Sequence, residues 1–361
     1  MTMAPGDVFF ERFGHDAIVV VDETTGAATS YNFGAFDPTE ADFMGRFARG
    51  EMMYYLVAMP LEQDLAYYRE VGRGAQVQWL DLPPQQLQAL ADLLAEEARP
   101  ENARYAYDYF TNNCATRVRD AIDEALGGAL KRQMSARSRG NSFRSESVRL
   151  ASPAAWMWIG FDLGLGPYAD KPLTRWDEAF VPMRLADSLR EAKNNDGRPL
   201  VQQQIEVLPH RIAPEPAEQP RRWWPWLLAG LTAAGLIVFF ARRQPRLLAA
   251  LLLPFWLLCG VGGALLLYLW GFTEHRAAWA NQNLLLLNPL CLALLPAGWA
   301  WLRGKETGAW SRRIAAMVAV AAFAAWFLHW LPFVFPFQEN RAWIALLLPV
   351  HVAVAYVFRK R

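Results

Sequence analysis

A cysteine and a histidine that lie far apart in the sequence have the side chains needed for thiol chemistry. Cys114 lies in YDYFTNNCATRVRDAIDEALGG, residues 107–128, and is the only cysteine before the apolar carboxy-terminal third. His15 lies in FERFGHDAIVV and is the only histidine in the first 200 residues. A thiolate attacks a carbonyl carbon after a neighbouring imidazole has taken the thiol proton. The two residues therefore predict a Cys–His nucleophilic site.

The residues that follow Cys114 have a helical pattern. Three apolar side chains recur on one face, at Val118, Ile122 and Leu126. Gly127 then provides a stop. The positive end of the helix dipole would meet the thiol and lower the pKa of Cys114 below the value of about 8.5 of a free cysteine. On spacing alone the alternative stays open that Cys114 is a small buried side chain and His15 an ordinary turn residue.

A predicted β-hairpin supplies a third residue for the site. Residues 16–22 (DAIVVVD) and 28–36 (ATSYNFGAF) have the composition of two strands on either side of a turn. Successive side chains of a strand point to opposite faces, so Asp16 is a poor orienter for His15. Asn32, on the paired strand, is better placed to fix the imidazole through its side-chain oxygen, and Tyr31 is the fallback. A polar residue on a solvated face is the alternative for Asn32.

Alternating strand and helix patterns surround this hairpin. They predict a helix over 39–49, a strand over 51–59, a helix over 61–71, a strand over 75–82 and an amphipathic helix between Pro84 and Pro100. A basic, serine-rich stretch at 131–151 reads as a solvated loop, with attraction of anionic headgroups as the alternative. Residues 161–170 read as a glycine-rich turn. The expected fold class is α+β. The base, His15, precedes the nucleophile, Cys114, in the sequence, whereas the cysteine comes first in ordinary papain-like enzymes.

Composition divides the chain in two. From Trp223 onward there are 12 Lys and Arg against 3 acidic residues, whereas residues 1–222 hold 24 basic and 32 acidic residues. A net charge of +9 after a net charge of −8 indicates a membrane domain after a water-soluble one. We place the soluble domain at 1–193, a linker at 194–222 and the transmembrane domain at 223–361. The acidic balance of the soluble part argues against a nucleic-acid partner.

Five apolar runs predict five transmembrane helices. They cover residues 223–241, 247–272, 283–302, 314–335 and 342–358. Each approaches the ~20 apolar residues that span a ~30 Å hydrocarbon core. Ten Lys and Arg residues lie beyond the ends on one side of these runs and four on the other. The positive-inside rule therefore predicts a cytoplasmic carboxy terminus and a soluble domain outside the cytoplasm.

Export of the soluble domain requires a signal that this sequence does not display. No apolar segment precedes His15. We expect the true translation start to lie upstream of Met1, with a signal segment and part of a first strand encoded there. In-frame stop codons immediately upstream would contradict this expectation.

Four ordered segments resemble the extracytoplasmic domain of the Lnb family of bacterial lipoprotein N-acyltransferases. They are PGDVFFERFGHDAIVV, SYNFGAFDPTEADFMGRFARGEMMYYL, YAYDYFTNNCATRVRD and GFDLGLGPYADKPLTRWDEAF, and together they cover about residues 4–192. The resemblance implies a permuted papain-like domain similar to lecithin:retinol acyltransferase. It also implies Cys114 as the acyl-accepting nucleophile and His15 as the base.

The resemblance further implies a reaction. An acyl chain would pass from the diacylglyceryl ester of a membrane lipoprotein to the amino-terminal amine through a thioester, without a metal or cofactor. The backbone amide of Cys114, with the side chain of Asn113, would hold the oxyanion. Arg117 would orient a polar headgroup, with a surface ion pair as the alternative. The expected partners are the lipid bilayer and lipidated amino termini of lipoproteins or phospholipid.

The resemblance places the protein in the bacterial inner membrane with a periplasmic soluble domain. Two other classes of function stay open. One is a lipid or cell-wall hydrolase that uses the same residues with water as the acceptor. The other is a membrane sensor or assembly protein without enzymatic activity.

Overall fold

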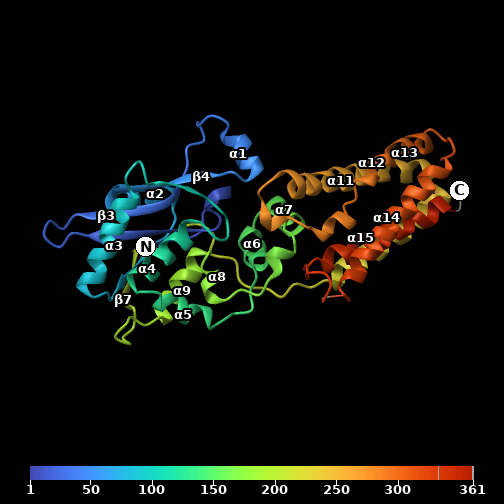
Figure 1. Ribbon diagram of the computed structural model, residues 1–361. Coiled ribbons are helices and arrows are strands. Elements are labelled where there is room, and N and C mark those ends of the chain that lie inside the picture. The colour runs from blue at the N-terminus through green and yellow to red at the C-terminus, as the bar shows by residue number, and fades with distance from the viewer. Residues whose placement is uncertain (332, 360–361) are drawn as a thin grey trace. The chain divides into compact units, whose positions relative to one another are not determined.

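A seven-stranded antiparallel sheet forms the centre of the amino-terminal part of the computed structural model, which describes residues 1–331 and 333–359 (Figure 1). The strand order is β6-β4-β3-β2-β1-β5-β7. The strands are β1 (Thr2–Met3), β2 (His15–Val21), β3 (Ala28–Ala35), β4 (Met53–Pro60), β5 (Ala75–Leu80), β6 (Arg104–Ala106) and β7 (Val201–Leu208). Helices pack against this sheet, so the predicted α+β class is confirmed.

The predicted hairpin is present as β2 and β3. Its register pairs Ala17 with Asn32 and Val21 with Ala28. His15 lies two residues before Ala17 and therefore shares a face of the sheet with Asn32. The short strand β1 pairs with β2 on the other side, with Met3 opposite His15.

Nine α-helices begin within the first 200 described residues. They are α1 (Phe43–Arg49), α2 (Leu61–Val71), α3 (Pro84–Glu97), α4 (Cys114–Ala125), α5 (Ala129–Ser135), α6 (Phe143–Ala151), α7 (Ala155–Gly164), α8 (Arg175–Glu178) and α9 (Pro182–Glu191). The helix predicted over 61–71 has these bounds, whereas the one predicted over 39–49 begins only at Phe43.

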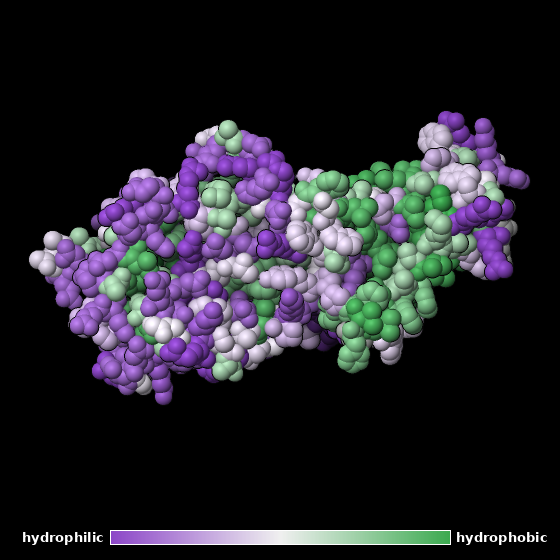
Figure 2. Space-filling view, viewed as in Figure 1, coloured by the Kyte–Doolittle hydropathy of each residue, from purple (hydrophilic) through white to green (hydrophobic). Residues whose placement is uncertain are grey.

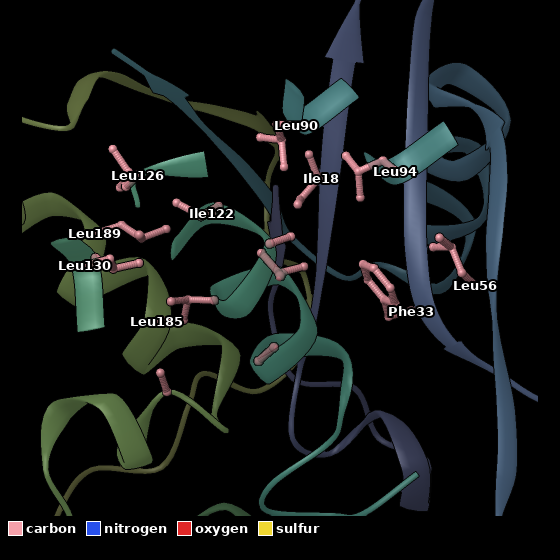
Figure 3. Close-up of a cluster of buried hydrophobic side chains, with 14 of the residues drawn as sticks. Ile18, Phe33, Leu56, Leu90, Leu94, Ile122, Leu126, Leu130, Leu185 and Leu189 are labelled. Atoms are coloured by element: carbon pink, nitrogen blue, oxygen red, sulfur yellow. The ribbon is translucent and has the colours of Figure 1, made fainter. Parts of the chain in front are cut away.

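The main hydrophobic core lies between the sheet and helices α3, α4, α5 and α9 (Figure 3). Its side chains include Ile18, Phe33, Leu56, Leu94, Ile122, Leu126 and Leu185. Burial of such large aliphatic and aromatic side chains contributes roughly 1.5–3 kcal/mol each. This core fixes α4, and thus Cys114 at its first position, against strands β2 and β3.

The basic stretch at 131–151 is not the solvated loop that we predicted. Much of it forms α5 and α6, and the side chain of Ser142 caps α6 by accepting a hydrogen bond from the Ser145 amide. Arg149 and Arg184 both form ion pairs with the buried carboxylate of Glu146. Burial and ion pairing thus account for Arg144 and Arg149, whereas Lys131, Arg132 and Arg137 remain exposed.

The predicted linker is also partly wrong. Residues 201–208 form β7, which pairs with β5 at the edge of the sheet. Both faces of this edge strand are exposed, glutamines included, and the apolar alternation that would mark a strand is therefore weak. The chain divides into two units, the first of which comprises Met1–Trp158 and Pro172–Ala217. The second comprises Ile159–Lys171 and the chain from Glu218 onward.

The second unit consists mainly of apolar helices. Among the residues that the structure describes, four helices are long and apolar enough to cross a membrane, namely α10 (Trp224–Arg243), α11 (Pro245–Phe272), α14 (Ala309–Leu328) and α15 (Arg341–Arg359). Apolar residues cover much of their surface (Figure 2). The predicted fourth span extended to residue 335, but α14 ends at Leu328.

The predicted third span is broken in the structure. It contains the short helices η4 (Gln282–Leu285), α12 (Leu290–Ala293) and α13 (Leu295–Leu302). The segment 282–293 and α13 meet at an angle of 54°, so the described residues contain five spans if this bent pair is counted as one. Pro289 and Pro296 lie at the breaks, where the absence of an amide proton interrupts helical hydrogen bonding.

Residues 159–171 belong to the second unit, contrary to the predicted boundary at 193. The side chain of Asn281 donates hydrogen bonds to the carbonyl oxygens of Leu163 and Gly164 at 2.8 and 2.9 Å. A Cβ on Gly166 would lie 2.2 Å from the carbonyl oxygen of Trp279, so only glycine fits there. These backbone contacts cannot be seen in residue types, which is why the segment reads as a simple turn.

Candidate active site

Cys114 is the first residue of α4, and a capping box fixes its position. The Asn113 side-chain oxygen accepts a hydrogen bond from the Thr116 amide at 2.9 Å. The Thr116 hydroxyl oxygen accepts one from the Asn113 amide at 2.7 Å. These two bonds satisfy amides that the first turn of a helix leaves free. The Cys114 residue itself remains partly exposed at the start of the helix.

The Asn113 side chain is a structural cap and not an oxyanion donor. Asn113 is 5 % exposed, and its side-chain nitrogen donates to the carbonyl oxygens of Tyr109 and Phe180 at 2.9 and 2.8 Å. Its oxygen is the helix cap, so both ends of the amide are occupied. The oxyanion role expected for this side chain is therefore wrong.

His15 and Asn32 meet on one face of the sheet. The distance between His15 Nε2 and Asn32 Oδ1 is 2.9 Å. Asn32 Nδ2 lies 2.9 Å from a carboxylate oxygen of Asp64 and 3.0 Å from the hydroxyl oxygen of Ser30. The Ser30 hydroxyl in turn donates to the same Asp64 oxygen at 2.6 Å. A chain of hydrogen bonds thus leads from α2 through β3 to the imidazole.

The donor and acceptor roles in this series of hydrogen bonds determine which imidazole nitrogen of His15 is basic. A carboxylate only accepts hydrogen bonds, so Asp64 requires Asn32 to turn its NH₂ group toward it. The Asn32 oxygen then faces His15 and accepts the Nε2 proton. Nδ1 consequently keeps the lone pair and is the nitrogen able to take a proton.

Sequence reasoning did not identify Asp64 or Ser30. Asp64 is 6 % exposed and lies on α2 between Leu61, Leu65 and Tyr68. Burial of an acidic residue on the apolar face of an amphipathic helix destabilises the fold unless the carboxylate has a hydrogen-bond or ion-pair partner. That position was therefore a usable signal for a buried hydrogen-bond network.

The thiol lies against the end of β2. The backbone amide of Asp16, the residue after His15, favours the thiolate of Cys114, as does the amide of Ala115. Burial nevertheless outweighs these amides and, with the negative charge of Asp16, raises the pKa of Cys114 to about 12. The prediction that the helix terminus lowers this pKa is therefore wrong, because desolvation is the larger effect.

The imidazole shows the corresponding shift. Burial lowers the pKa of His15 to about 4, although its hydrogen bond to Asn32 and the charge of Asp64 act in the opposite direction. Burial likewise raises the pKa of Asp16 to about 7, with partial compensation by the hydrogen bond from Thr2. The resting site thus contains a neutral thiol and a neutral imidazole.

A neutral pair gives a distinct pH dependence of Cys114 alkylation. In the Cys259→Ala/Cys291→Ala variant, Cys114 is the one cysteine left to react with iodoacetamide. Its alkylation rate should still be increasing with pH at pH ~8.5, where a free cysteine is half ionised. The rate should reach no plateau at neutral pH, because the thiolate becomes abundant only near the raised pKa of about 12. A plateau extending down to pH ~5 would indicate a preformed thiolate–imidazolium pair and contradict this result.

Arg117 lies one turn after Cys114 and has partners of its own. Its guanidinium is 3.7 Å from a carboxylate oxygen of Glu97 and 4.5 Å from the ring centroid of Tyr105. This is the ion pair that we considered as the alternative to headgroup binding.

Two family models match the chain. The Lnb N-terminal periplasmic domain matches residues 1–150, and the Lnb transmembrane domain matches residues 219–361. No curated protein and no solved structure matches the chain. The two models together cover the site, most of the sheet and all five apolar segments. This chain, a membrane protein with a periplasmic domain, therefore belongs to the Lnb family.

Proposed function

We propose that this protein is a membrane-bound lipoprotein N-acyltransferase. It moves an acyl chain from the diacylglyceryl ester of a lipoprotein to the amino-terminal amine of the same lipoprotein through a thioester on Cys114. The observation that carries the proposal is the position of Cys114 at the start of α4, where its thiol lies beside the strand whose first residue is His15. The oriented His15–Asn32–Asp64 chain supplies the base.

The reaction has two half-reactions at one thiol. Cys114 attacks the ester carbonyl while Nδ1 of His15 takes the thiol proton. The tetrahedral intermediate collapses, the glyceryl oxygen leaves, and His15 returns the proton to it as an alcohol. The lipoprotein amine then attacks the thioester and loses a proton to His15, and the thiol takes up that proton on leaving. The product is an N-acylated lipoprotein with one free glyceryl hydroxyl.

A row of aromatic rings supports a long acyl chain as the group transferred. Tyr107, whose ring borders the same space beside Gly34 as Cys114, is the first of them. Successive ring centroids are 4.4, 5.1 and 5.7 Å apart along the series Tyr107, Tyr54, Phe36 and Phe10. Phe10 at the end of the row is 62 % exposed. A series of aromatic side chains that leads from an exposed ring toward Cys114 suits an alkyl chain better than a peptide.

The proposed setting is the bacterial inner membrane, with the sheet-containing unit in the periplasm and the carboxy terminus in the cytoplasm. The asymmetry of Lys and Arg described above supports this orientation. A lipoprotein presents its ester and its amine at the membrane surface. Tethering the thiol unit there removes the need to extract the acyl chains, whose transfer to water is costly.

Mass spectrometry of a reporter lipoprotein tests the function. With the wild-type protein, the reporter should carry an amide-linked acyl chain and a monoacylated glyceryl group. Loss of one ester chain with a free amine would instead identify a hydrolase. An unchanged amino terminus would favour the sensor or assembly role.

A further inference from the structure

The site contains a buried phenol hydroxyl that none of the steps above uses. Tyr105 lies in β6 and is 7 % exposed. Its hydroxyl oxygen is inaccessible to solvent and has no hydrogen-bond partner among the described residues. A buried hydroxyl without a hydrogen bond destabilises the folded state, so its retention calls for an explanation.

The hydroxyl points into the space beside the nucleophile. A Cβ built on Gly34 would lie 3.8 Å from the Tyr105 hydroxyl oxygen and 3.8 Å from the Cβ atom of Cys114. Gly34 has φ +98° at an irregularity in the pairing of β3 with β4, a conformation that favours glycine. The missing side chain leaves space between the phenol and the cysteine.

We propose that Tyr105 donates a hydrogen bond to the oxyanion that forms when Cys114 attacks an acyl ester, and that the space beside Gly34 receives this oxygen. As the C–S bond forms, the carbonyl π electrons move onto oxygen, and the phenol hydrogen-bonds to that charge while keeping its own proton. Collapse of the intermediate returns the electrons and expels the glyceryl oxygen. The inference rests on the proposed function and adds a second donor to the backbone amide of Cys114.

The surroundings of Tyr105 suit a fixed donor. Its ring packs edge-to-face on Phe33 with centroids 6.3 Å apart, and β6 pairs it with Tyr54 of β4. The Arg117 guanidinium stands 4.5 Å from the ring centroid and withdraws electron density from the phenol. Burial raises the pKa of Tyr105, so the hydroxyl keeps its proton. A preorganised donor of this kind costs no reorganisation when the charge develops.

The test is Tyr105→Phe in the full chain, reconstituted in nanodiscs, with p-nitrophenyl octanoate as the acyl donor. We expect the rate of Cys114 acylation, read as the p-nitrophenolate burst, to fall about 10²–10³-fold, mainly in kcat. The alkylation of Cys114 by iodoacetamide forms no oxyanion and should stay within about twofold of the wild-type rate. The matched control is Tyr55→Phe, which removes the phenol hydroxyl of a partly buried tyrosine of β4 that the proposed mechanism does not use, and it should leave acylation unchanged.

The two readouts separate this inference from the proposed function. A Tyr105→Phe protein with wild-type acylation, or with alkylation reduced as much as acylation, would overturn the role of Tyr105 alone. An acylation burst that survives Cys114→Ala would instead overturn the thiol mechanism. The burst requires no particular acceptor, so it does not depend on whether an amine or water resolves the thioester.

Discussion

Replacement of Cys114 by alanine should reduce acyl transfer to background, a loss of about 10⁴-fold or more. The thioester has no other carrier, because Cys259 and Cys291 are buried among the apolar helices. Cys114→Ser should be nearly as damaging, since a hydroxyl is far harder to ionise than a thiol. The measurement is the mass of the reporter lipoprotein's amino-terminal peptide, together with the mass of the protein after incubation with the ester.

The matched control is Cys259→Ala, which removes a thiol that the mechanism does not use. It should retain acyl transfer. Neither substitution removes a large side chain, so thermal unfolding should change little. Full activity of Cys114→Ala would refute a thiol mechanism and place the sensor or assembly function ahead.

His15→Ala should lower the rate of acylation by about 10²–10⁴-fold, the usual contribution of a general base. The wild-type pH profile gives a second check. His15 is a base only when neutral, so activity is lost as pH falls through its pKa. Because burial lowers that pKa to about 4, the acid limb of kcat/KM should lie near pH 4 and not near 6.5. An acid limb near 6.5 would show that the imidazole is not desolvated in the working enzyme.

Asn32→Ala should lower the rate of acylation less than His15→Ala does, because Asn32 orients the imidazole ring but does not take the proton. The acid limb of the pH profile should nevertheless move to lower pH, since the hydrogen bond from His15 to Asn32 favours the protonated imidazole. A merely structural role would leave the limb unchanged.

The parts of the fold that sequence predicted well are those set by local pattern. The β-branched run 16–21, the helix from Leu61 to Val71 and the helix opened by Asn113-Cys114 need only alternation, periodicity and a cap. The pairing of His15 with Asn32 followed from the hairpin alone, because alternation fixes which side chains share a face.

The remaining features depend on contacts between distant segments. Asp64 reaches Asn32 only after α2 has packed on the sheet, and β7 becomes a strand only because β5 offers it an unpaired edge. The protonation of Cys114 depends on how much water the folded site excludes. The helix terminus alone predicts a lowered pKa for Cys114, whereas burial raises it. Tyr105 is one of several tyrosines near Cys114 in the sequence, and only the fold shows which hydroxyl is left unpaired.

The assignment of residues 159–171 to the membrane unit determines how the protein can be dissected. The chain passes between the units at 158/159, 171/172 and 217/218, so one protease cut within 209–222 leaves them covalently joined. A fragment that stops at residue 193 carries the segment FDLGLGPYAD without Asn281 and Trp343, which donate hydrogen bonds to its backbone and to the carboxylate of Asp162. It also lacks β7 at the sheet edge. A soluble derivative would instead keep residues up to 217 and replace 159–171 by a short polar loop.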